Sequence, residues 1–228
     1  MKKAHFYVDG FSFKRINDYY RYEHKRRSRL NIAAFETYLR YEIARKLGIS
    51  SDSESLSFEK HFYYPSPNPR TCFYKSSVTD TILNFENCLA EAGYIVHYSR
   101  KISTLEPRPN ENLFADSLVA TQLKKIDLFI LLSTQGQHAN ILQQMRHCKI
   151  PNILVGWEAI CRNSRGAFSK WKTDRILCGF ANAYSPLERI LDLPSGKHPL
   201  TETMFENFFS LYRPPAFSPS YPLNLRCG

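Results

Sequence analysis

The sequence lacks the local signatures of most cofactor-dependent enzymes. It contains no Gly-x-Gly-x-x-Gly segment, no phosphate loop ending in Gly-Lys-Ser or Gly-Lys-Thr, and no His-Glu-x-x-His motif. Its six cysteines are scattered, without a Cys-x-x-Cys pair or a histidine at a zinc-finger interval. We therefore expect no nucleotide cofactor and no zinc. We also expect reduced, mostly buried thiols in an intracellular, cytoplasmic protein.

Long apolar runs are also missing. No stretch approaches the roughly 20 apolar residues that a membrane-spanning helix requires, so we expect no membrane partner. A chain of 228 residues can bury a core without a disulfide or metal, and we expect one main domain over residues 1–184. Seven of the thirteen prolines lie in residues 185–228. We interpret that segment as a Pro-rich C-terminal extension that packs on the domain or on a partner.

Acidic residues are fewer than basic ones. The chain has 31 Lys and Arg residues against 21 Asp and Glu residues, which gives a net charge of +10. An excess of this size favours a polyanionic partner, because each phosphate contact releases counterions. Nucleic acid is the most direct candidate.

The apolar pattern alternates between short strands and helices. Helical spacing is found over residues 32–47, 78–92, 113–125 and 138–147, and strand-like segments over 56–64, 94–98, 127–132 and 152–155. Such alternation predicts an α/β fold with a mainly parallel sheet. Near the C-terminus, residues 203–212 can form one short amphipathic helix that docks on the core, on a second subunit in a homodimer, or on a protein partner.

A carboxylate stands at the end of the first predicted strand. Asp9 closes the apolar segment Phe6-Tyr7-Val8 and is followed by helix-like sequence. Because the carboxyl ends of parallel strands border the ligand crevice, Asp9 is well placed to hold a cation. The alternative is a helix N-cap, which would use the same side chain to accept backbone N–H groups.

Four short motifs occur in the order found in one known family. Residues 9–12 read Asp-Gly-Phe-Ser, and residues 133–138 read Ser-Thr-Gln-Gly-Gln-His. These segments resemble the NYN family of PIN-like nucleases, whose corresponding strands end in Asp-Gly-Phe-Asn and Ser-Gly-Asp-Ser-Asp-Phe. Residues 115–123 are similar to the start of a family helix, and residues 173–177 to its closing Ala-Asp-x-Phe.

The resemblance implies a PIN-like three-layer α/β/α sandwich and a site for metal-dependent phosphodiester cleavage. Family members cluster carboxylates around a divalent metal, but here Gln122, Gln135 and Gln137 stand where the family usually has Asp. Mg²⁺ is anchored by carboxylates, and amides supply no charge. By motif matching, the expected catalytic positions are Asp9, Asp116, Asp174, Gln135 and Gln137, with a weakly bound Mg or Mn at Asp9 and Asp116.

A basic, tyrosine-rich segment follows the Asp9 turn. Residues 19–29 contain three tyrosines together with Arg21, Lys25, Arg26, Arg27 and Arg29. Cations interleaved with aromatic rings suit single-stranded RNA, where phosphates and unstacked bases are contacted together. The alternative is a solvated helix face with a charged loop.

A second basic patch follows the strand that ends near Gly156. Its members are Arg162, Arg165, Lys170, Lys172 and Arg175. Trp157 and Trp171 bracket these residues, and each can stack on a base or anchor the core.

Three functions remain open from the sequence. The first is an RNA-binding protein of the NYN type whose ribonuclease activity is weak or lost. The second is an active Mg- or Mn-dependent endoribonuclease in which Glu111 or Glu158 completes the site. The third is a protein-interaction scaffold that uses the C-terminal extension.

Overall fold

A single parallel sheet organises the molecule. The computed structural model describes residues 1–50, 55–64, 77–98, 111–123, 125–162 and 167–205. Its six strands lie in the order β3-β2-β1-β4-β5-β8, and every neighbouring pair is parallel. The strands are β1 (Lys2–Asp9), β2 (Leu56–Tyr64), β3 (Tyr94–Tyr98), β4 (Leu128–Leu132), β5 (Asn152–Gly156) and β8 (Ala183–Pro186). The predicted α/β fold with a parallel sheet is confirmed.

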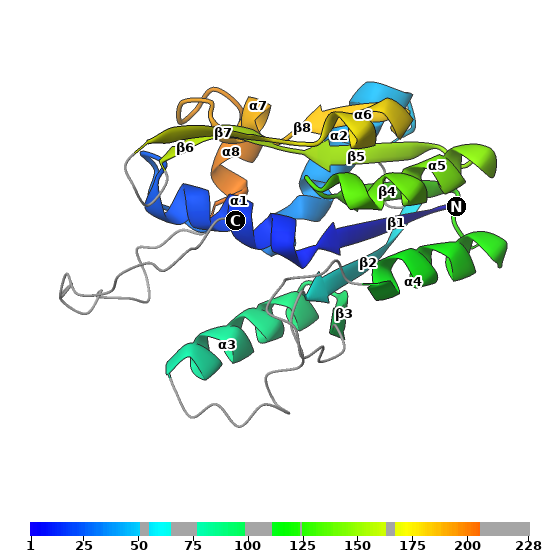
Figure 1. The fold of residues 1–228 in the computed structure, drawn as a ribbon, viewed down its shortest axis with the longest axis horizontal. Coiled ribbons are helices and arrows are strands. Elements are labelled where there is room, and N and C mark those ends of the chain that lie inside the picture. Colours follow the sequence, from blue (N-terminus) through cyan, green and yellow to red (C-terminus); the bar gives the residue numbers. More distant parts are fainter. Residues whose placement is uncertain (51–54, 65–76, 99–110, 124, 163–166, 206–228) are drawn as a thin grey trace.

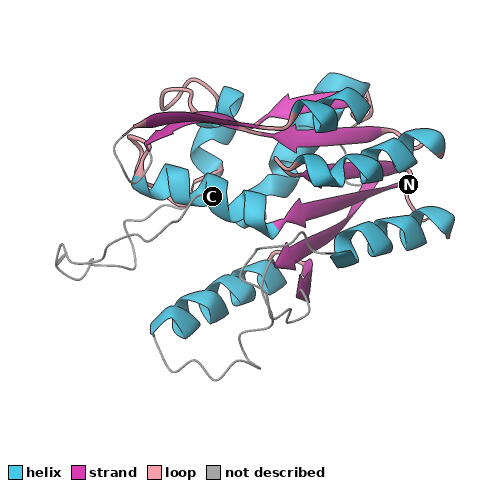
Figure 2. Cartoon of the chain, in the orientation of Figure 1, coloured by secondary structure: helices cyan, strands magenta, loops and turns pink. Residues whose placement is uncertain are grey.

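Helices cover the sheet on two faces (Figure 2). They are α1 (Gly10–Tyr22), α2 (Phe35–Leu47), α3 (Ser77–Glu91), α4 (Glu111–Gln122), α5 (Ala139–His147), α6 (Arg175–Phe180), α7 (Glu188–Leu191) and α8 (Pro199–Thr203). Two 3₁₀ turns, η1 (Ile32–Ala34) and η3 (Gly136–His138), lead into α2 and α5. An antiparallel hairpin of β6 (Glu158–Arg162) and β7 (Phe168–Lys172) follows β5.

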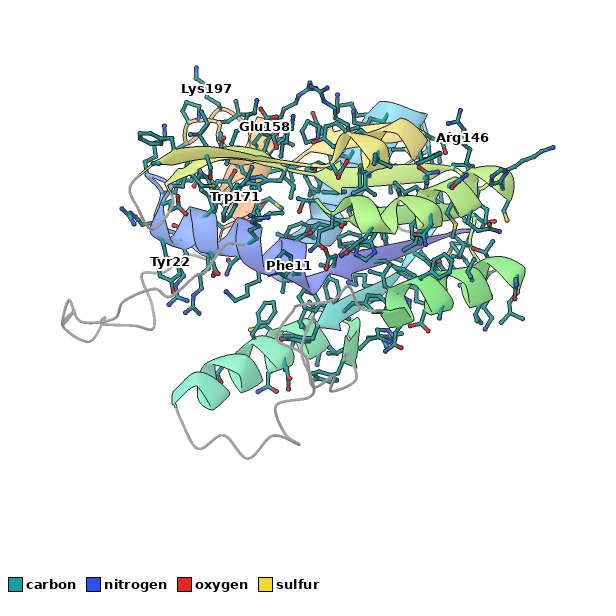
Figure 3. The ribbon with its side chains drawn as sticks, viewed as in Figure 1. Phe11, Tyr22, Arg146, Glu158, Trp171 and Lys197 are labelled. Carbon is teal, nitrogen blue, oxygen red and sulfur yellow. The ribbon has the colours of Figure 1, made fainter. Side chains whose placement is uncertain are left out.

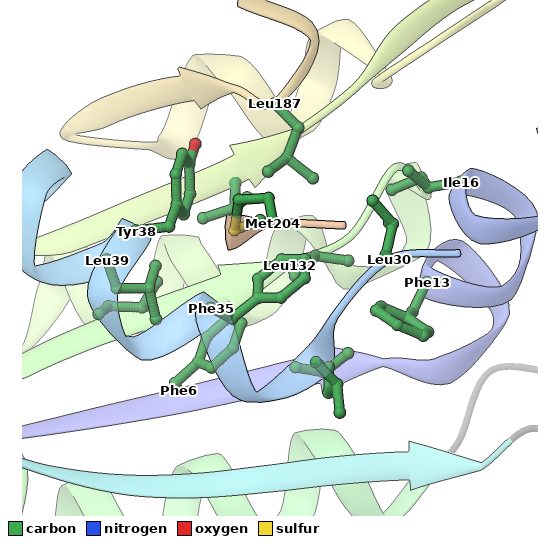
Figure 4. Packing of buried hydrophobic residues seen from close by; sticks show 14 of the residues in the cluster. Phe6, Phe13, Ile16, Leu30, Phe35, Tyr38, Leu39, Leu132, Leu187 and Met204 are labelled. Carbon is green, nitrogen blue, oxygen red and sulfur yellow. The ribbon is translucent and has the colours of Figure 1, made fainter. Parts of the chain in front are cut away.

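Alternation along the strands creates two hydrophobic clusters. Phe6 and Val8 point to the face covered by α1, α2, α3, α7 and α8, where they pack with residues such as Phe35 (Figure 4). Tyr7 points to the other face and packs with residues of α4, α5 and α6, including Leu142. Burial of both faces explains why the strands read as nearly continuous apolar runs.

Local signals in the sequence fix several helix ends. The Asn31 side chain accepts a hydrogen bond from the Ala33 N–H at 3.1 Å and starts η1, as the polar residue before the apolar series predicts. Gly48 adopts a left-handed conformation with φ 62° and ends α2. The predicted helix over 32–47 is therefore confirmed, with its first turn in 3₁₀ form.

The C-terminal part of the described chain packs into the same core. The boundary predicted at residue 184 falls inside β8, and Leu191 and Met204 are fully buried in the larger cluster. The backbone of Leu30 forms an isolated bridge with Phe205. Proline fits at the end of β8 because it is an edge strand. The helix predicted over 203–212 lies largely outside the described residues, and α8 ends at Thr203.

Two further expectations concern membranes and thiols. Among the described residues, no helix has the length and apolar character needed to span a bilayer. The prediction of mostly buried thiols is wrong for the described cysteines, since Cys88 and Cys148 are exposed, Cys178 is half-buried and Cys161 is buried. Cys88 is exposed because it lies on the solvent side of α3, and Cys148 is exposed because it directly follows the end of α5.

Candidate functional site at the carboxyl ends of β1 and β4

The topology of the sheet marks one crevice. From β1 the chain continues to β2 and β3 on one side, and then crosses to β4 and β5 on the other. In open parallel sheets, ligands bind outside the carboxyl ends of the two strands where the direction of winding reverses. Here those strands are β1, which ends at Asp9, and β4, which is followed by Ser133 and Thr134. The sequence prediction that Asp9 and the turn after β4 share one rim is confirmed.

Asp9 is buried and fully engaged by hydrogen bonds. Only 4% of the residue is exposed. Its Oδ1 accepts the Phe11 N–H at 3.2 Å, so Asp9 does cap α1. Its Oδ2 accepts the Ser12 hydroxyl at 2.6 Å and the Ser133 hydroxyl at 3.2 Å. The N-cap predicted for Asp9 is therefore confirmed, and its carboxylate lies at the predicted rim.

Hydroxyl groups join the turns that follow the two strands. Because Ser12 gives its proton to Asp9, its oxygen accepts the Thr134 N–H at 2.9 Å and lies 3.1 Å from the Thr134 hydroxyl. The Ser133 oxygen accepts the Gln135 N–H at 3.1 Å. The turn after β4 is thus held to the start of α1 through one aspartate and its hydroxyl donors.

His138 lies beside this group without bonding to it. Its Nε2 is 3.8 Å from Asp9 Oδ2, and the residue is 3% exposed. This nitrogen has no hydrogen-bond partner among the described residues. Burial lowers the pKa of His138 although the Asp9 carboxylate acts in the opposite direction. His138 is therefore neutral at pH 7 and is positioned as an uncharged neighbour of Asp9.

The two glutamines and Asp174 form the outer part of the rim. The Gln137 side-chain amide nitrogen donates a hydrogen bond to the Gln135 amide oxygen. Asp174 caps α6 by accepting the Ile176 N–H at 2.9 Å, and its own N–H bonds the Thr134 carbonyl at 3.1 Å. Its carboxylate lies against Gly136, where an added Cβ would be 2.4 Å from Oδ2. Asp174 therefore shares this rim, but as a helix cap.

Asp116 is held by residues of β2 and β3. It lies on α4, and its Oδ2 accepts the Tyr63 hydroxyl at 3.0 Å and is 3.3 Å from His97 Nδ1. Tyr63 is the register partner of Asp9 on the neighbouring strand. Asp116 thus belongs to the same end of the sheet, one strand away from Asp9.

The three aspartates do not fit the metal that the family resemblance implies. Each accepts hydrogen bonds from different donors, and Asp9 is nearly inaccessible. Within the described residues, none of them belongs to a group of three potential ligands close enough to share one ion. A hard cation such as Mg²⁺ would have to displace hydroxyl donors from Asp9 and would find amides at Gln135 and Gln137.

The basic segment after α1 divides into anchored and exposed cations. The Arg26 guanidinium donates to the Leu193 carbonyl and lies 3.5 Å from Glu202, and its side chain is 14% exposed. Lys25 and Arg27 are exposed, and Arg27 has a φ of 51°. Sequence reasoning missed the structural role of Arg26 because its partners are about 170 residues away in the chain.

Arg21 and Arg29 are half-buried members of the same segment. The Arg21 guanidinium lies 4.7 Å from the centre of the Tyr22 ring. The solvent-exposed part of each side chain could contact a ligand, but both side chains are less exposed than those of Lys25 and Arg27.

The second basic patch lies on the β6–β7 hairpin. Lys170 pairs with Glu158 at 2.7 Å, and Lys172 is exposed. Phe168 shares their side of β7 and is 72% exposed. The side chain of Arg162 and the whole of Arg165 lie outside the described residues.

The two tryptophans differ in their surroundings. Trp157 is 1% exposed and is a core residue. Trp171 is half-buried between the hairpin and α1 (Figure 3). The Arg15 guanidinium lies 3.5 Å from its ring centre. No sequence pattern predicts this contact, because it depends on the hairpin lying alongside α1 (Figure 1).

Comparisons with known proteins identify a similar fold but give no information on function. No family model matches the sequence, and no curated protein matches it. The structure is similar to the crystal structure of a protein of unknown function from Vibrio parahaemolyticus, with a TM-score of 0.54 and 12% sequence identity. The match covers 82% of this chain and 93% of that chain. At this identity it indicates a shared fold alone.

Proposed function

We propose that the protein is an RNA-acting member of the NYN type that binds single-stranded RNA and has weak or lost metal-dependent ribonuclease activity. The observation that carries the proposal is the state of Asp9. It occupies the position expected of a metal-binding aspartate at the switch point of the sheet, yet it is buried and bonded to Ser12 and Ser133. Because the Asp9 carboxylate keeps this position but is already occupied by hydrogen bonds, we expect RNA binding and not RNA cleavage.

Two cationic surfaces on one side of the sheet support binding. Helix α1 and the β6–β7 hairpin both extend beyond the carboxyl ends of the strands (Figure 1). The hairpin presents Phe168 beside Lys170 and Lys172, and the segment after α1 presents Lys25 and Arg27. Cations that follow phosphates and a ring that stacks on bases are the elements of sequence-tolerant single-strand binding.

The lost acids support weak chemistry. Water attack on a phosphodiester needs a cation that generates hydroxide and offsets charge on the phosphoryl oxygens. The described residues offer no carboxylate cluster for it at the rim. We therefore expect RNA binding without efficient hydrolysis.

Binding and cleavage assays with a mixed pool of single-stranded RNA, with and without Mn²⁺, test this proposal. We expect salt-sensitive binding and little cleavage under both conditions. Replacing Lys25 and Arg27 by Ala, or Lys170 and Lys172 by Ala, should weaken binding and flatten the salt dependence by about one unit per phosphate contact removed. The matched control is Arg146→Ala, because Arg146 is exposed at the opposite end of the molecule (Figure 3).

Three results would change the conclusion. Strong Mn²⁺-dependent cleavage that disappears with Asp9→Asn would select the active endoribonuclease. Equal losses for Arg146→Ala and the two double variants would reduce the binding to general charge attraction. Absence of RNA binding altogether would leave the interaction scaffold.

A further inference from the structure

Two histidines and a glutamate meet on the face of the sheet that carries α4. His5 and Glu59 are register partners on β1 and β2, and His61 lies two residues beyond Glu59 on the same face. One nitrogen from each histidine and one carboxylate oxygen lie within 4.8 Å of one another. His5 and His61 are 2% and 6% exposed, whereas the Glu59 side chain is 50% exposed. The group is therefore buried on one side and open to solvent on the other.

The spacing of these atoms suits a small divalent cation. Glu59 Oε1 is 3.0 Å from His61 Nε2, and Glu59 Oε2 is 3.8 Å from His5 Nε2. Ligand atoms in a tetrahedral zinc site lie roughly 3.3–3.5 Å apart, given bonds of about 2.0–2.2 Å. The observed distances lie on either side of that value. Two imidazoles and one carboxylate also form a ligand set that zinc and similar transition metals accept.

A proton count along the neighbouring contacts points the same way. His61 Nε2 faces Glu59, His61 Nδ1 is 3.0 Å from His97 Nε2, and His97 Nδ1 is 3.3 Å from Asp116 Oδ2. Three contacts need three protons, but two neutral imidazoles carry only two. A cation bound to His61 Nε2 and Glu59 removes this deficit, because His61 Nδ1–H then donates to His97 and His97 Nδ1–H donates to Asp116.

The two ring nitrogens of His5 have different surroundings. His5 Nδ1 is buried without a hydrogen-bond partner among the described residues, and Nε2 lies 3.1 Å from the Lys125 carbonyl. The ammonium groups of Lys3 and Lys125 oppose a cation near His5, and the Glu59 carboxylate offsets them.

We propose that His5, Glu59 and His61 bind a divalent transition-metal cation of the zinc type, and that His97 and Asp116 orient His61 for it. A ligating histidine whose second N–H is held by a hydrogen-bonded chain is the arrangement that fixes ring orientation in metal sites. Three protein ligands leave one position for water or for the Lys125 carbonyl. The three ligands are not part of the Asp9 rim, although Asp116 lies at the same end of the sheet. The proposal does not depend on the proposed RNA function.

Metal binding to the reduced, full-length protein without a histidine tag tests this site. Zn²⁺ affinity is measured by competition with a chromophoric chelator, and Co²⁺ is used as a spectroscopic probe of coordination. We expect one Zn²⁺ per chain and an affinity at least tenfold weaker for Glu59→Gln. Glu91→Gln is the matched control, since Glu91 is an exposed glutamate of α3, and it should bind within twofold of the wild type.

Glu59→Gln is informative because half of the Glu59 side chain is in solvent, so we expect the fold to stay intact. A second variant, Asp116→Asn, should weaken Zn²⁺ about tenfold without removing a ligand, because it loosens the chain that orients His61. The proposal is overturned if Glu59→Gln binds like Glu91→Gln, or if the wild type binds no Zn²⁺. A thiolate-to-cobalt charge-transfer band would also overturn it, since cysteines would then be the ligands.

Discussion

Replacing Asp9 by Asn distinguishes a buried structural carboxylate from a metal-binding one. In an acidic metal site, removing one carboxylate relieves repulsion and stabilises the metal-free protein, at the expense of activity. Here Asp9 has no acidic neighbour in a shared ligand group within the described residues, and it accepts three hydrogen bonds. We therefore expect Asp9→Asn to destabilise the metal-free protein.

The magnitude follows from the individual bonds. Asn is as good an N-cap as Asp, so the bond from the Phe11 N–H is kept. The bonds from the Ser12 and Ser133 hydroxyls go to a charged oxygen, and such bonds contribute about 1.5–3 kcal/mol each. Because the hydroxyls can rotate and accept from the new amide, we expect a net loss of about 1–2 kcal/mol.

Urea and thermal unfolding in the presence of a chelator measure this loss. For a chain of this size, each kcal/mol lowers the Tm by roughly 2–4 °C. The control is Asp18→Asn, which removes an exposed partner of Lys14 on α1 and should change stability by less than about 0.5 kcal/mol. If Asp9→Asn raises the Tm, the carboxylate is a repelled member of an acidic site and our reasoning on Asp9 is wrong.

Three further predictions concern packing, pH and thiol reactivity. Gly136→Ala should cost about 1–3 kcal/mol, because its Cβ would lie 2.4 Å from a carboxylate oxygen, whereas Gly179→Ala, with nothing within 4 Å, should be neutral or stabilising. Burial raises the pKa of Glu42, but hydrogen bonds from Arg45 and a serine hydroxyl lower it by more than burial raises it. The pKa of Glu42 is therefore below its usual value. Its contribution is complete above the unfolded carboxyl value of about 4.3 and is lost as pH falls towards the folded value, so Glu42→Gln should flatten the acid limb of urea midpoints between pH 7 and 3. Burial raises the pKa of Cys161 to about 12, so mass spectrometry after alkylation at pH 8 should find this thiol modified last.

Each of these has a clear contrary result. Equal stability of the two glycine variants would mean that the carboxylate beside Gly136 moves aside without cost. An unchanged acid limb for Glu42→Gln would show that other carboxylates control acid unfolding. Early alkylation of Cys161 would show that the core around it opens readily.

Elements with strong periodicity could be predicted from the sequence, and those with weak periodicity could not. The structure confirms the helix at 32–47, where apolar spacing and a capping residue agree. It also confirms the strands at 56–64 and 94–98. For the β6–β7 hairpin the sequence predicts only a basic patch, since Phe168, Lys170 and Lys172 on its outer side form no apolar stripe. Strand β8 is four residues long and ends in proline, so the boundary predicted at residue 184 divides it between the domain and the extension.

The candidate site shows the same limit. The rim position of Asp9 could be predicted because a strand, a polar turn and a helix follow one another in the sequence. Its burial could not, because the Ser133 hydroxyl comes from a position 124 residues away. The approach of His5 to His61 depends on the register between β1 and β2, which no local pattern fixes.

The contacts between the basic segment and the C-terminal part of the described chain have a consequence for folding during synthesis. Arg26 bonds the Leu193 carbonyl, the Asn31 N–H bonds the Met204 carbonyl at 2.9 Å, and Leu30 pairs with Phe205. These partners leave the ribosome long after the central strands, at roughly 5–20 residues per second. The segment at 23–31 therefore cannot complete these contacts until residues 193–205 have been made, although it is itself made early. In a nascent chain that stops before residue 193, the strands of the sheet would already be present, but the cationic loop would lack these contacts.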